Sequence, residues 1–459
     1  MRAGATLRIA VAAVGSLSLV LWSVGAPGAP GRAPELLVTV ADVTDTSAVL
    51  WAREPTAAPI AVEITSEADG ARRTLVIEPS ADRDLTGQAR IGALAPGTRY
   101  EYCLQSSNSA VGGEFVTAPA ADRAAPLRLL WSADLGGRGF CRRADAGYAI
   151  FDAMAARRPD RFLFLGDTIY ADRRCTGDGV VPGAEFVART LPEFHARHRY
   201  NREDPAVQRL LRRTAVWATW DDHDVRGNFS GSAQSLMPVG RQAFIDYWAV
   251  DAPSGDANRL YRSFRHGTLA ELFILDTRQY RSANCARDGL DKTMLGERQR
   301  RWLIDGLAAS QAVWKLVASS VPLSITKAWP CGDSWASREL LLFSTGFARE
   351  RDSILSDLAR RGVTNLVFLV ADVHFALFAV HEPSPGFRFH ELVAGPLAAR
   401  PRRARPPDGT LRSAVLSSAG RVPTFGELDI DAHGLTARII DGGGTVLATE
   451  RLTPAATGR

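Results

Sequence analysis

Lysine is nearly missing from this chain of 459 residues. Only Lys292, Lys315 and Lys327 occur, so almost all of the 55 basic residues are arginines. The arginines are scattered along the chain, and the sequence therefore predicts no nucleic-acid-binding surface. The bias could favour bidentate binding of phosphate or carboxylate groups, or it could reflect coding composition alone.

Long apolar runs are missing beyond the N-terminus. Arg2 and Arg8 precede an apolar run over 9–24, and small residues and prolines follow it. This pattern is typical of a secretory signal, and the run is shorter than the roughly 20 residues that a spanning helix needs. We predict a signal peptide and the start of a linker over 1–29, and an exported protein that is periplasmic, cell-surface or secreted. A retained N-terminal anchor is the alternative.

Cysteines are few, and their number, five, is odd. Cys103 lies in a strand pattern, where we expect it to be buried and free. The other four, Cys141, Cys175, Cys285 and Cys331, fall in predicted loops and fit an oxidising compartment. Chain order alone suggests the pairs 141–175 and 285–331, but Cys141 or Cys175 could instead lie near a metal site.

Short apolar strands separated by turns fill residues 36–118, which predicts a small β-sandwich domain. Its turn Pro96-Gly97-Thr98-x-Tyr100 resembles those of fibronectin type III and related Ig-like modules. An Ala/Pro-rich linker over 118–126 then marks a boundary.

From residue 127 strand-like runs alternate with helical stretches, which predicts an α/β domain over 127–455. The expected strands are 127–133, 161–166, 215–220, 271–276, 313–321 and 364–371, and the expected helices are 144–158, 240–249, 297–309 and 350–361. The stretch 425–453 returns to strands.

Polar residues follow most of the expected strands of the α/β domain. They are Asp134, Asp167, the run Asp221-Asp222-His223-Asp224, Asp276, and the pair Asp372 and His374. Ligands of open α/β sheets bind beyond the carboxyl ends of the strands, so these side chains should converge on one rim. Carboxylates gathered there would repel each other unless cations compensate them, and the sequence therefore predicts bound metal ions.

Each of these residues also has a simpler interpretation. A single aspartate after a strand is usually a turn or cap residue, and Asp221 and Asp224 look more like capping or supporting groups than ligands. His374 could be a satisfied core histidine, Tyr170 could pack against the domain, and Arg278 could form a structural ion pair. Five strands that all end in aspartate are harder to explain as caps.

Four motifs in this order resemble those of the PhoD-like alkaline phosphatases. They are Gly166-Asp167-x-Ile169-Tyr170, Trp220-Asp221-Asp222-His223-Asp224, Leu275-Asp276-Thr277-Arg278 and Asp372-x-His374. The resemblance extends from about residue 36 to 395 and includes that family's N-terminal β-module. It implies the fold of the calcineurin-like metallophosphoesterases, a four-layer α/β/β/α sandwich, here preceded by a small Ig/fibronectin-III-like domain.

The resemblance also implies Ca²⁺ and Fe³⁺, two or more ions in all. The residues that it would make metal ligands are Asp134, Asp167, Tyr170, Asp222, Asn228, Asp372 and His374, with Asp167 bridging and Tyr170 binding iron. The family commonly places a Ser-Cys sequence at the end of the first strand, whereas this chain reads Ser132-Ala133-Asp134. We infer that Asp134 supplies the ligand there, which leaves the identity of the first metal open.

These resemblances predict an exported alkaline phosphatase that hydrolyses phosphate monoesters through a metal-activated water. His223 would protonate the leaving alkoxide or steady the phosphoryl oxygen, and Arg278 would clamp the phosphate. A phosphodiesterase acting on wall polymers or phospholipids is one alternative. A non-catalytic protein that binds cell-surface material through its Ig-like domain is another.

Overall fold

The structure is a computed structural model that describes residues 36–455, apart from 108, 328–329 and 341–342. The predicted signal over 1–29 lies outside the described residues. No helix of the described part has the length and apolar character needed to cross a membrane.

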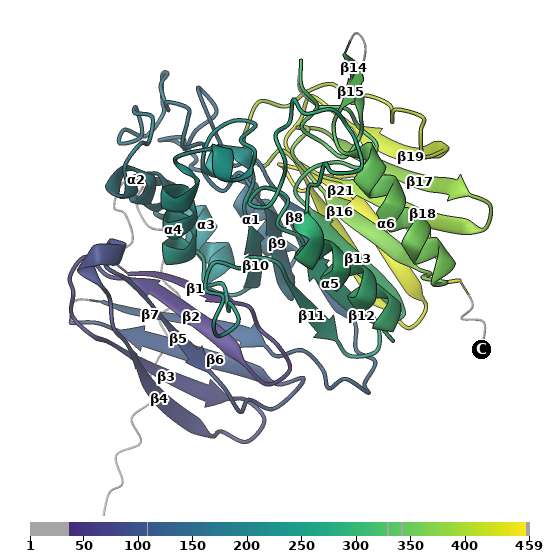
Figure 1. The fold of residues 1–459 in the computed structure, drawn as a ribbon. Coiled ribbons are helices and arrows are strands. Elements are labelled where there is room, and N and C mark those ends of the chain that lie inside the picture. Colours follow the sequence, from purple (N-terminus) through teal and green to yellow (C-terminus); the bar gives the residue numbers. More distant parts are fainter. Residues whose placement is uncertain (1–35, 108, 328–329, 341–342, 456–459) are drawn as a thin grey trace, which may run out of the picture. The chain divides into compact units, whose positions relative to one another are not determined.

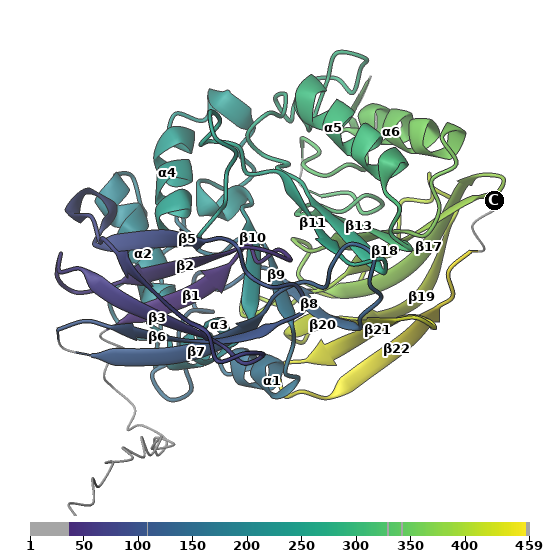
Figure 2. The same ribbon diagram turned by 90° about the horizontal axis from the view of Figure 1, so that it is seen from below.

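Nine strands form the first sheet, which runs across the molecule in Figure 2. Their order is β22 (Val446–Leu452), β21 (Gly434–Asp441), β20 (Thr424–Asp431), β8 (Leu127–Ser132), β9 (Arg161–Leu165), β10 (Ala215–Thr219), β1 (Leu37–Ala41), β2 (Ala48–Arg53) and β5 (Thr86–Ile91). β8, β9 and β10 are parallel neighbours. Every residue of β9 and β10 is buried, as expected of parallel strands covered on both faces.

Seven strands form the second sheet. Their order is β11 (Arg262–His266), β12 (Ala270–Ile274), β13 (Trp314–Ser319), β16 (Leu366–Val370), β18 (Phe387–Val393), β17 (Ala376–Ser384) and β19 (Ser413–Ala419). β12, β13, β16 and β18 are parallel. A separate hairpin, β14 (Arg338–Leu340) and β15 (Phe343–Thr345), follows β13 in the chain.

The two sheets face each other and helices cover their outer faces (Figures 1 and 2). Side chains such as Leu163 of the first sheet and Leu369 of the second share one apolar cluster between them. The first sheet's outer face packs against α1 (Ile150–Ala156), α3 (Pro205–Leu211) and α4 (Met237–Tyr247), with α2 (Leu191–Arg202) beside α4. The second packs against α5 (Gly296–Ala309) and α6 (Ala348–Arg360). These layers confirm the predicted α/β/β/α arrangement.

The N-terminal strands form two sheets, one of which belongs to the large sheet just described. β4 (Arg72–Ile77), β3 (Ile60–Ser66), β6 (Arg99–Gln105) and β7 (Ala110–Val116) form a separate four-stranded sheet. It shares an apolar cluster with β1, β2 and β5. β1 in turn pairs in parallel with β10 through Ala41 and Val216, so the N-terminal strands extend the first sheet. The proposed division into domains 36–118 and 127–455 stays a prediction.

Most predicted elements of the α/β part occur within one to three residues of their expected bounds, but several regions differ. The helix expected over 144–158 begins only at Ile150, because Gly147 has a positive φ of 58° and the backbone N–H of Tyr148 donates to Asp204. Helices α2 and α3 and strands β11, β14, β15 and β17 to β19 were not predicted. α2 buries His195, Arg197 and His198, so it has no apolar periodicity to detect.

Both predicted disulfides are present, Cys141–Cys175 and Cys285–Cys331. Neither Cys141 nor Cys175 therefore offers a thiolate to a metal ion. Cys103 is free as predicted, but the expectation that it is buried was wrong, because its side chain on β6 is partly exposed.

Candidate metal centre

Carboxylates from both sheets meet at one rim. Asp134, Asp167 and Asp222 follow the parallel strands β8, β9 and β10, and Asp372 follows β16 of the facing sheet. All four side chains are buried, with at most 5% exposed. One carboxylate oxygen from each of Asp167, Asp221, Asp222 and Asp372 can be chosen so that all lie within 4.8 Å of one another. The convergence expected from the strand ends therefore occurs.

The backbone turns sharply at most of these positions. Five of the seven predicted ligands have a positive φ: Asp134 (65°), Asp167 (48°), Asn228 (56°), Asp372 (72°) and His374 (61°). This conformation costs non-glycine residues about 1–3 kcal/mol and clusters at functional sites. Gly166 has a φ of 98°, and a Cβ there would lie 2.5 Å from the Cβ of Asp221, so glycine is required where the ends of β9 and β10 approach each other.

Buried carboxylate oxygens at this rim lack hydrogen-bond donors among the described residues. They are Asp134 Oδ1 and Oδ2, Asp167 Oδ2, Asp221 Oδ2, Asp222 Oδ1 and Asp372 Oδ2. Burial and the neighbouring carboxylates, Asp222 first, raise the pKa of Asp167 well above its usual range. Burial, with Asp221 next, raises the pKa of Asp134 to about 7. Such a cluster is costly unless cations compensate it, so the residues fit a metal centre.

His374 has the hydrogen bonding of a metal ligand. Its Nδ1 lies 2.9 Å from the carbonyl oxygen of Arg400, which can only accept, so Nδ1 carries the proton and Nε2 keeps a free electron pair. Nε2 lies 3.2 Å from the hydroxyl of Tyr170 and 3.7 Å from Asp134 Oδ1. Burial lowers the pKa of His374 to about 4, which keeps the imidazole neutral. Asp134, Tyr170 and His374 thus lie together, and their role as ligands of one metal ion stays a prediction.

His223 is fixed from three sides beside these carboxylates. Its backbone N–H donates to Asp167 Oδ1 at 2.9 Å, and its ring stacks on Tyr170 at 4.3 Å. Its Nδ1 lies 2.6 Å from Asp172 Oδ1, and Asp172 also accepts from the N–H of Gly227. Burial disfavours the imidazolium, yet Asp222 and Asp172 raise the pKa of His223 above its usual value. Sequence reasoning missed Asp172, although a carboxylate two residues after Tyr170 was a usable signal.

Asn228 reaches the centre through its backbone. Its N–H donates to Asp222 Oδ2 at 2.6 Å, and its carbonyl accepts from Asn284 at 2.9 Å. The residue is exposed, and the metal-binding role of its side-chain amide stays a prediction.

Arg278 is completely buried and bound to carboxylates. Its Nε donates to Asp221 at 2.5 Å, and Nη1 and Nη2 donate to Asp333 at 2.8 and 3.1 Å. These contacts match the simpler interpretation of Arg278 that the sequence allowed, a structural ion pair. Its role as a phosphate clamp stays a prediction.

Asp333 and Lys327 are neighbours of the centre that sequence reasoning did not find. Asp333 is buried and accepts from Arg278, Arg281 and Asn284. The Lys327 ammonium contacts Asp372 and lies 3.1 Å from Asp333 Oδ2 and 3.5 Å from Asp222 Oδ1. Both residues come from a loop after β13, where no strand end marks them.

Two other strand-end aspartates are fully occupied by hydrogen bonds. Asp224 accepts from the hydroxyl of Thr168 and from the N–H groups of Ile169 and Asp221. Asp276, after β12, accepts from the Trp220 indole and from the N–H groups of Arg278 and Gln279. Both act as turn caps, which agrees with the simpler interpretation of Asp224.

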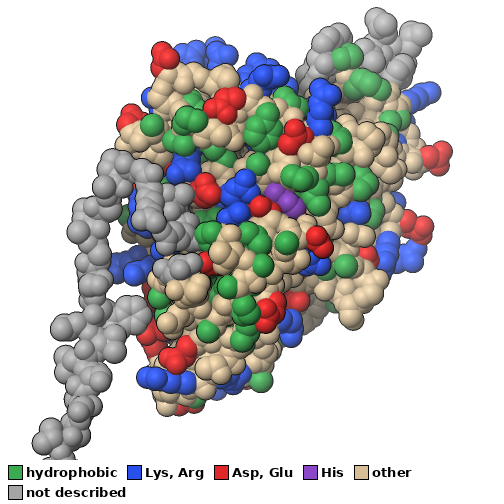
Figure 3. Space-filling view, turned by 90° about the vertical axis from the view of Figure 1, so that its left-hand side faces the viewer, with side chains coloured by type: hydrophobic (Ala, Val, Ile, Leu, Met, Phe, Trp, Pro, Cys, Tyr) green, Lys and Arg blue, Asp and Glu red, His purple; other side chains and the backbone are tan. Residues whose placement is uncertain are grey.

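The molecular face in Figure 3 carries basic and acidic side chains interspersed with apolar ones. Lys and Arg side chains form no continuous stripe on this face, and the absence of a nucleic-acid-binding surface stays a prediction.

Comparisons with known proteins identify the family of this chain. The PhoD-like phosphatase family model matches residues 135–436. Alkaline phosphatase D of Bacillus subtilis (strain 168) is 27% identical over 264 residues, which are 51% of this chain and 44% of that protein. The match therefore spans less than half of that relative's length.

Two solved structures share the fold. A structure of PhoD superposes with a TM-score of 0.74 at 20% identity, covering 93% of this chain and 94% of that one. A purple acid phosphatase, PPD1 from yellow lupin (Lupinus luteus) seeds, superposes with a TM-score of 0.62 at 12% identity, covering 91% and 74%. The family match covers about two thirds of the chain, and this chain belongs to the PhoD-like phosphatase family.

Proposed function

We propose that this chain is an exported, metal-dependent phosphatase that hydrolyses phosphate monoesters. The observation that carries the proposal is the group of buried carboxylate oxygens without donors at the shared rim of the two sheets. Membership of the PhoD-like phosphatase family supports the reaction class. The two disulfides support an oxidising compartment and hence export.

The ligands divide into two groups that share Asp167. We assign Asp134, Tyr170 and His374 to the first group, because Nε2 of His374 lies near both other residues. We assign Asp222, Asn228 and Asp372 to the second, because Asp222 lies near Asp372 and accepts from the N–H of Asn228. A donor set dominated by oxygen suits hard cations, and we propose iron(III) on the first side and calcium on the second. When bound, such ions lower the pKa of a water and neutralise charge on the phosphoryl oxygens. Ala133 stands where the resembling family commonly has cysteine, so Asp134 takes that ligand position without a thiolate.

His223 is the proposed proton donor to the leaving alkoxide. Its imidazole is 16% exposed, which lets it reach a substrate, while Asp172 holds Nδ1 and so directs Nε2 away from that contact. A donor held in this way delivers its proton to the leaving oxygen as the phosphorus–oxygen bond breaks. Asp172 is the positioning residue for this step.

Purified protein assayed with p-nitrophenyl phosphate and with bis-p-nitrophenyl phosphate tests the proposal, with metal analysis of the same sample. We expect hydrolysis of the monoester, at least one tightly bound metal ion per chain, and loss of activity with a chelator. Faster hydrolysis of the diester would favour the phosphodiesterase alternative. Full activity without bound metal would refute the proposal.

A further inference from the structure

Lys327 is placed like a metal ion. It is one of only three lysines in the chain and follows β13. Its ammonium contacts Asp372 Oδ1 and lies within 3.5 Å of carboxylates of Asp333 and Asp222. Its side chain is only 18% exposed. These carboxylates come from three separate segments, so the ammonium is enclosed by negative charge.

The shape of the ammonium suits this position better than a guanidinium would. It is a compact charge with three N–H donors; it donates to Asp372 and lies 3.1 and 3.5 Å from oxygens of Asp333 and Asp222. Arg278 and Arg281 also donate to Asp333. Asp222 and Asp372 are also the proposed ligands of the calcium-type ions. A cation bound by Asp222 and Asp372 would therefore share these two carboxylates with Lys327.

We propose that Lys327 takes the place of one divalent cation, so that the centre binds one calcium ion fewer than its carboxylates would otherwise hold. This inference rests on the proposed function. The Lys327 ammonium would then neutralise part of the carboxylate charge at the centre whether or not calcium is available.

Calcium titration of metal-stripped protein tests the role of Lys327. Lys327→Met removes the charge and keeps most of the side chain, and Lys327→Arg keeps the charge. Lys315→Met is a matched control, because Lys315 is a buried lysine of β13 that donates to the carbonyl of Ala312. We expect one additional calcium ion per chain in Lys327→Met by dialysis and elemental analysis, with wild type, Lys327→Arg and Lys315→Met alike.

Equal calcium stoichiometry in wild type and Lys327→Met would overturn the inference. The two proposals fail differently. If wild type binds metal and hydrolyses the monoester but Lys327→Met gains no ion, only the role of Lys327 is wrong. If wild type neither binds metal nor hydrolyses phosphate esters, the proposed function fails, and the role of Lys327 fails with it.

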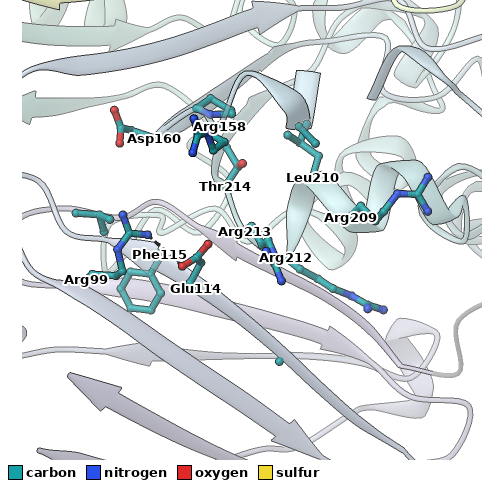
Figure 4. Close-up of a pocket in the computed structure, with 14 residues that line it drawn as sticks. Arg99, Glu114, Phe115, Arg158, Asp160, Arg209, Leu210, Arg212, Arg213 and Thr214 are labelled. Carbon is teal, nitrogen blue, oxygen red and sulfur yellow. Dashed lines mark hydrogen bonds and ion pairs between the residues drawn. The ribbon is translucent and has the colours of Figure 1, made fainter. Parts of the chain in front are cut away.

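A second, independent feature is an arginine-rich cavity of about 530 Å³ (Figure 4). It opens between β7 and the residues that precede β9 and β10, among them Pro159 and Thr214. It therefore lies at the amino ends of the strands whose carboxyl ends carry the metal centre. Arg158, Arg212 and Arg213 line it together with Phe115 and Leu210, and Figure 4 shows Phe115 next to Arg99 and Glu114.

The carboxylates of Glu114 and Asp160 also line the cavity, but none of the three arginines Arg158, Arg212 and Arg213 forms an ion pair within the described residues. The other two arginines of the cavity do: Arg99 pairs with Glu114 and Arg209 with Asp152. Arg212 Nε is buried and has no hydrogen-bond partner among the described residues. A guanidinium that is partly removed from water without an acceptor is costly, and a bound anion would relieve that cost.

The geometry points to a second, non-catalytic site in this cavity that binds an organic phosphate. Guanidinium groups bind phosphate in a bidentate manner, and apolar side chains such as Phe115 and Leu210 line part of the remaining wall, together with the carboxylates of Glu114 and Asp160. The volume exceeds that of a bare phosphate and falls in the range of small-molecule sites, about 300–1,000 Å³.

Calorimetry with glycerol phosphate on chelator-treated protein tests this site, because the metal centre then contributes no phosphate binding. We expect the double variant Arg158→Gln/Arg212→Gln to bind at least tenfold more weakly than wild type, with p-nitrophenyl phosphate hydrolysis by the metal-loaded enzymes unchanged. Arg298→Gln/Arg301→Gln on α5 is the control, since it removes two exposed arginines elsewhere. Absence of binding to chelator-treated wild type, or equal affinity in the double variant, would overturn the site.

Discussion

Two sets of aspartates follow buried strands at the same rim: Asp224 and Asp276 form one set, and Asp134 and Asp167 form the other. The two sets differ in the number of hydrogen bonds that their carboxylates accept. Asp224 and Asp276 accept from several backbone and side-chain donors, so their charge is used within the fold. Asp134 accepts no side-chain or backbone donor among the described residues, and Asp167 keeps one oxygen free. Burial is the same in both sets, at 1% exposure or less.

The comparison shows that position after a strand does not decide the role of an aspartate. The hydrogen-bond donors around the carboxylate decide that role. A cap is surrounded by N–H groups of its own turn, whereas a ligand points toward other carboxylates and has a backbone conformation that holds it there. The difference can be tested by changing one member of each set.

Asp167→Asn should have the largest effect. It removes the carboxylate shared by both groups of proposed ligands, so we expect activity on p-nitrophenyl phosphate to fall by at least about 10³-fold, with fewer metal ions bound. Steady-state kinetics and elemental analysis measure both quantities. Wild-type activity in a correctly folded variant would show that Asp167 is not a ligand.

Asp172→Asn should slow catalysis by about 10- to 100-fold, since general acid catalysis contributes about 10²–10⁴-fold and the variant keeps His223 but loses its orientation. The loss should be larger for alkyl phosphates than for p-nitrophenyl phosphate, because a poor leaving group needs the proton more. Metal content should stay the same. An identical loss on both substrates would argue against proton donation.

Removal of metal should make stability depend on pH. Burial raises the pKa of Asp134 from 3.8 to about 7, so the folded metal-free protein holds a proton that the unfolded chain has released. The free energy of unfolding should therefore decrease as pH rises from about 4 to about 7. Thermal melts with a chelator, compared with melts in calcium, measure this. A chelated protein that is equally stable at both pH values would contradict it.

Asp276→Asn should have the smallest effect on function. The cap loses charge-assisted hydrogen bonds to Trp220 and to two backbone N–H groups, which should cost about 1–3 kcal/mol of stability. Denaturant unfolding measures the loss. Bound metal should stay at the wild-type level, and a fall in metal content would place Asp276 with the ligands instead.

Much of the fold and of the rim could be predicted from the sequence. Buried parallel strands appear as continuous apolar runs, and the residue after each run is then placed by topology alone. Topology therefore brings Asp134, Asp167, Asp222 and Asp372 together without any knowledge of their contacts. The helix α2 could not be found in this way, because it buries polar residues such as His195 and Arg197.

Partners from loops could not be predicted either. Lys327 and Asp333 reach the centre through tertiary contacts that leave no local pattern in the sequence. Arg278 is likewise buried between two carboxylates, Asp221 and Asp333, that are distant from it in the chain. A sequence shows that a charged residue follows a strand. Whether an oppositely charged side chain compensates that charge depends on segments that are distant in the chain.

The pairing of β1 with β10 sets a limit on how this protein can be shortened. Deleting the N-terminal strands would remove β1 from the side of β10, along with the hydrogen bond from Asp42 to Val216. A fully buried strand would then become an unprotected sheet edge, which is a template for aggregation. A shortened chain made for expression should therefore begin before Leu36, even when only the metal centre is of interest.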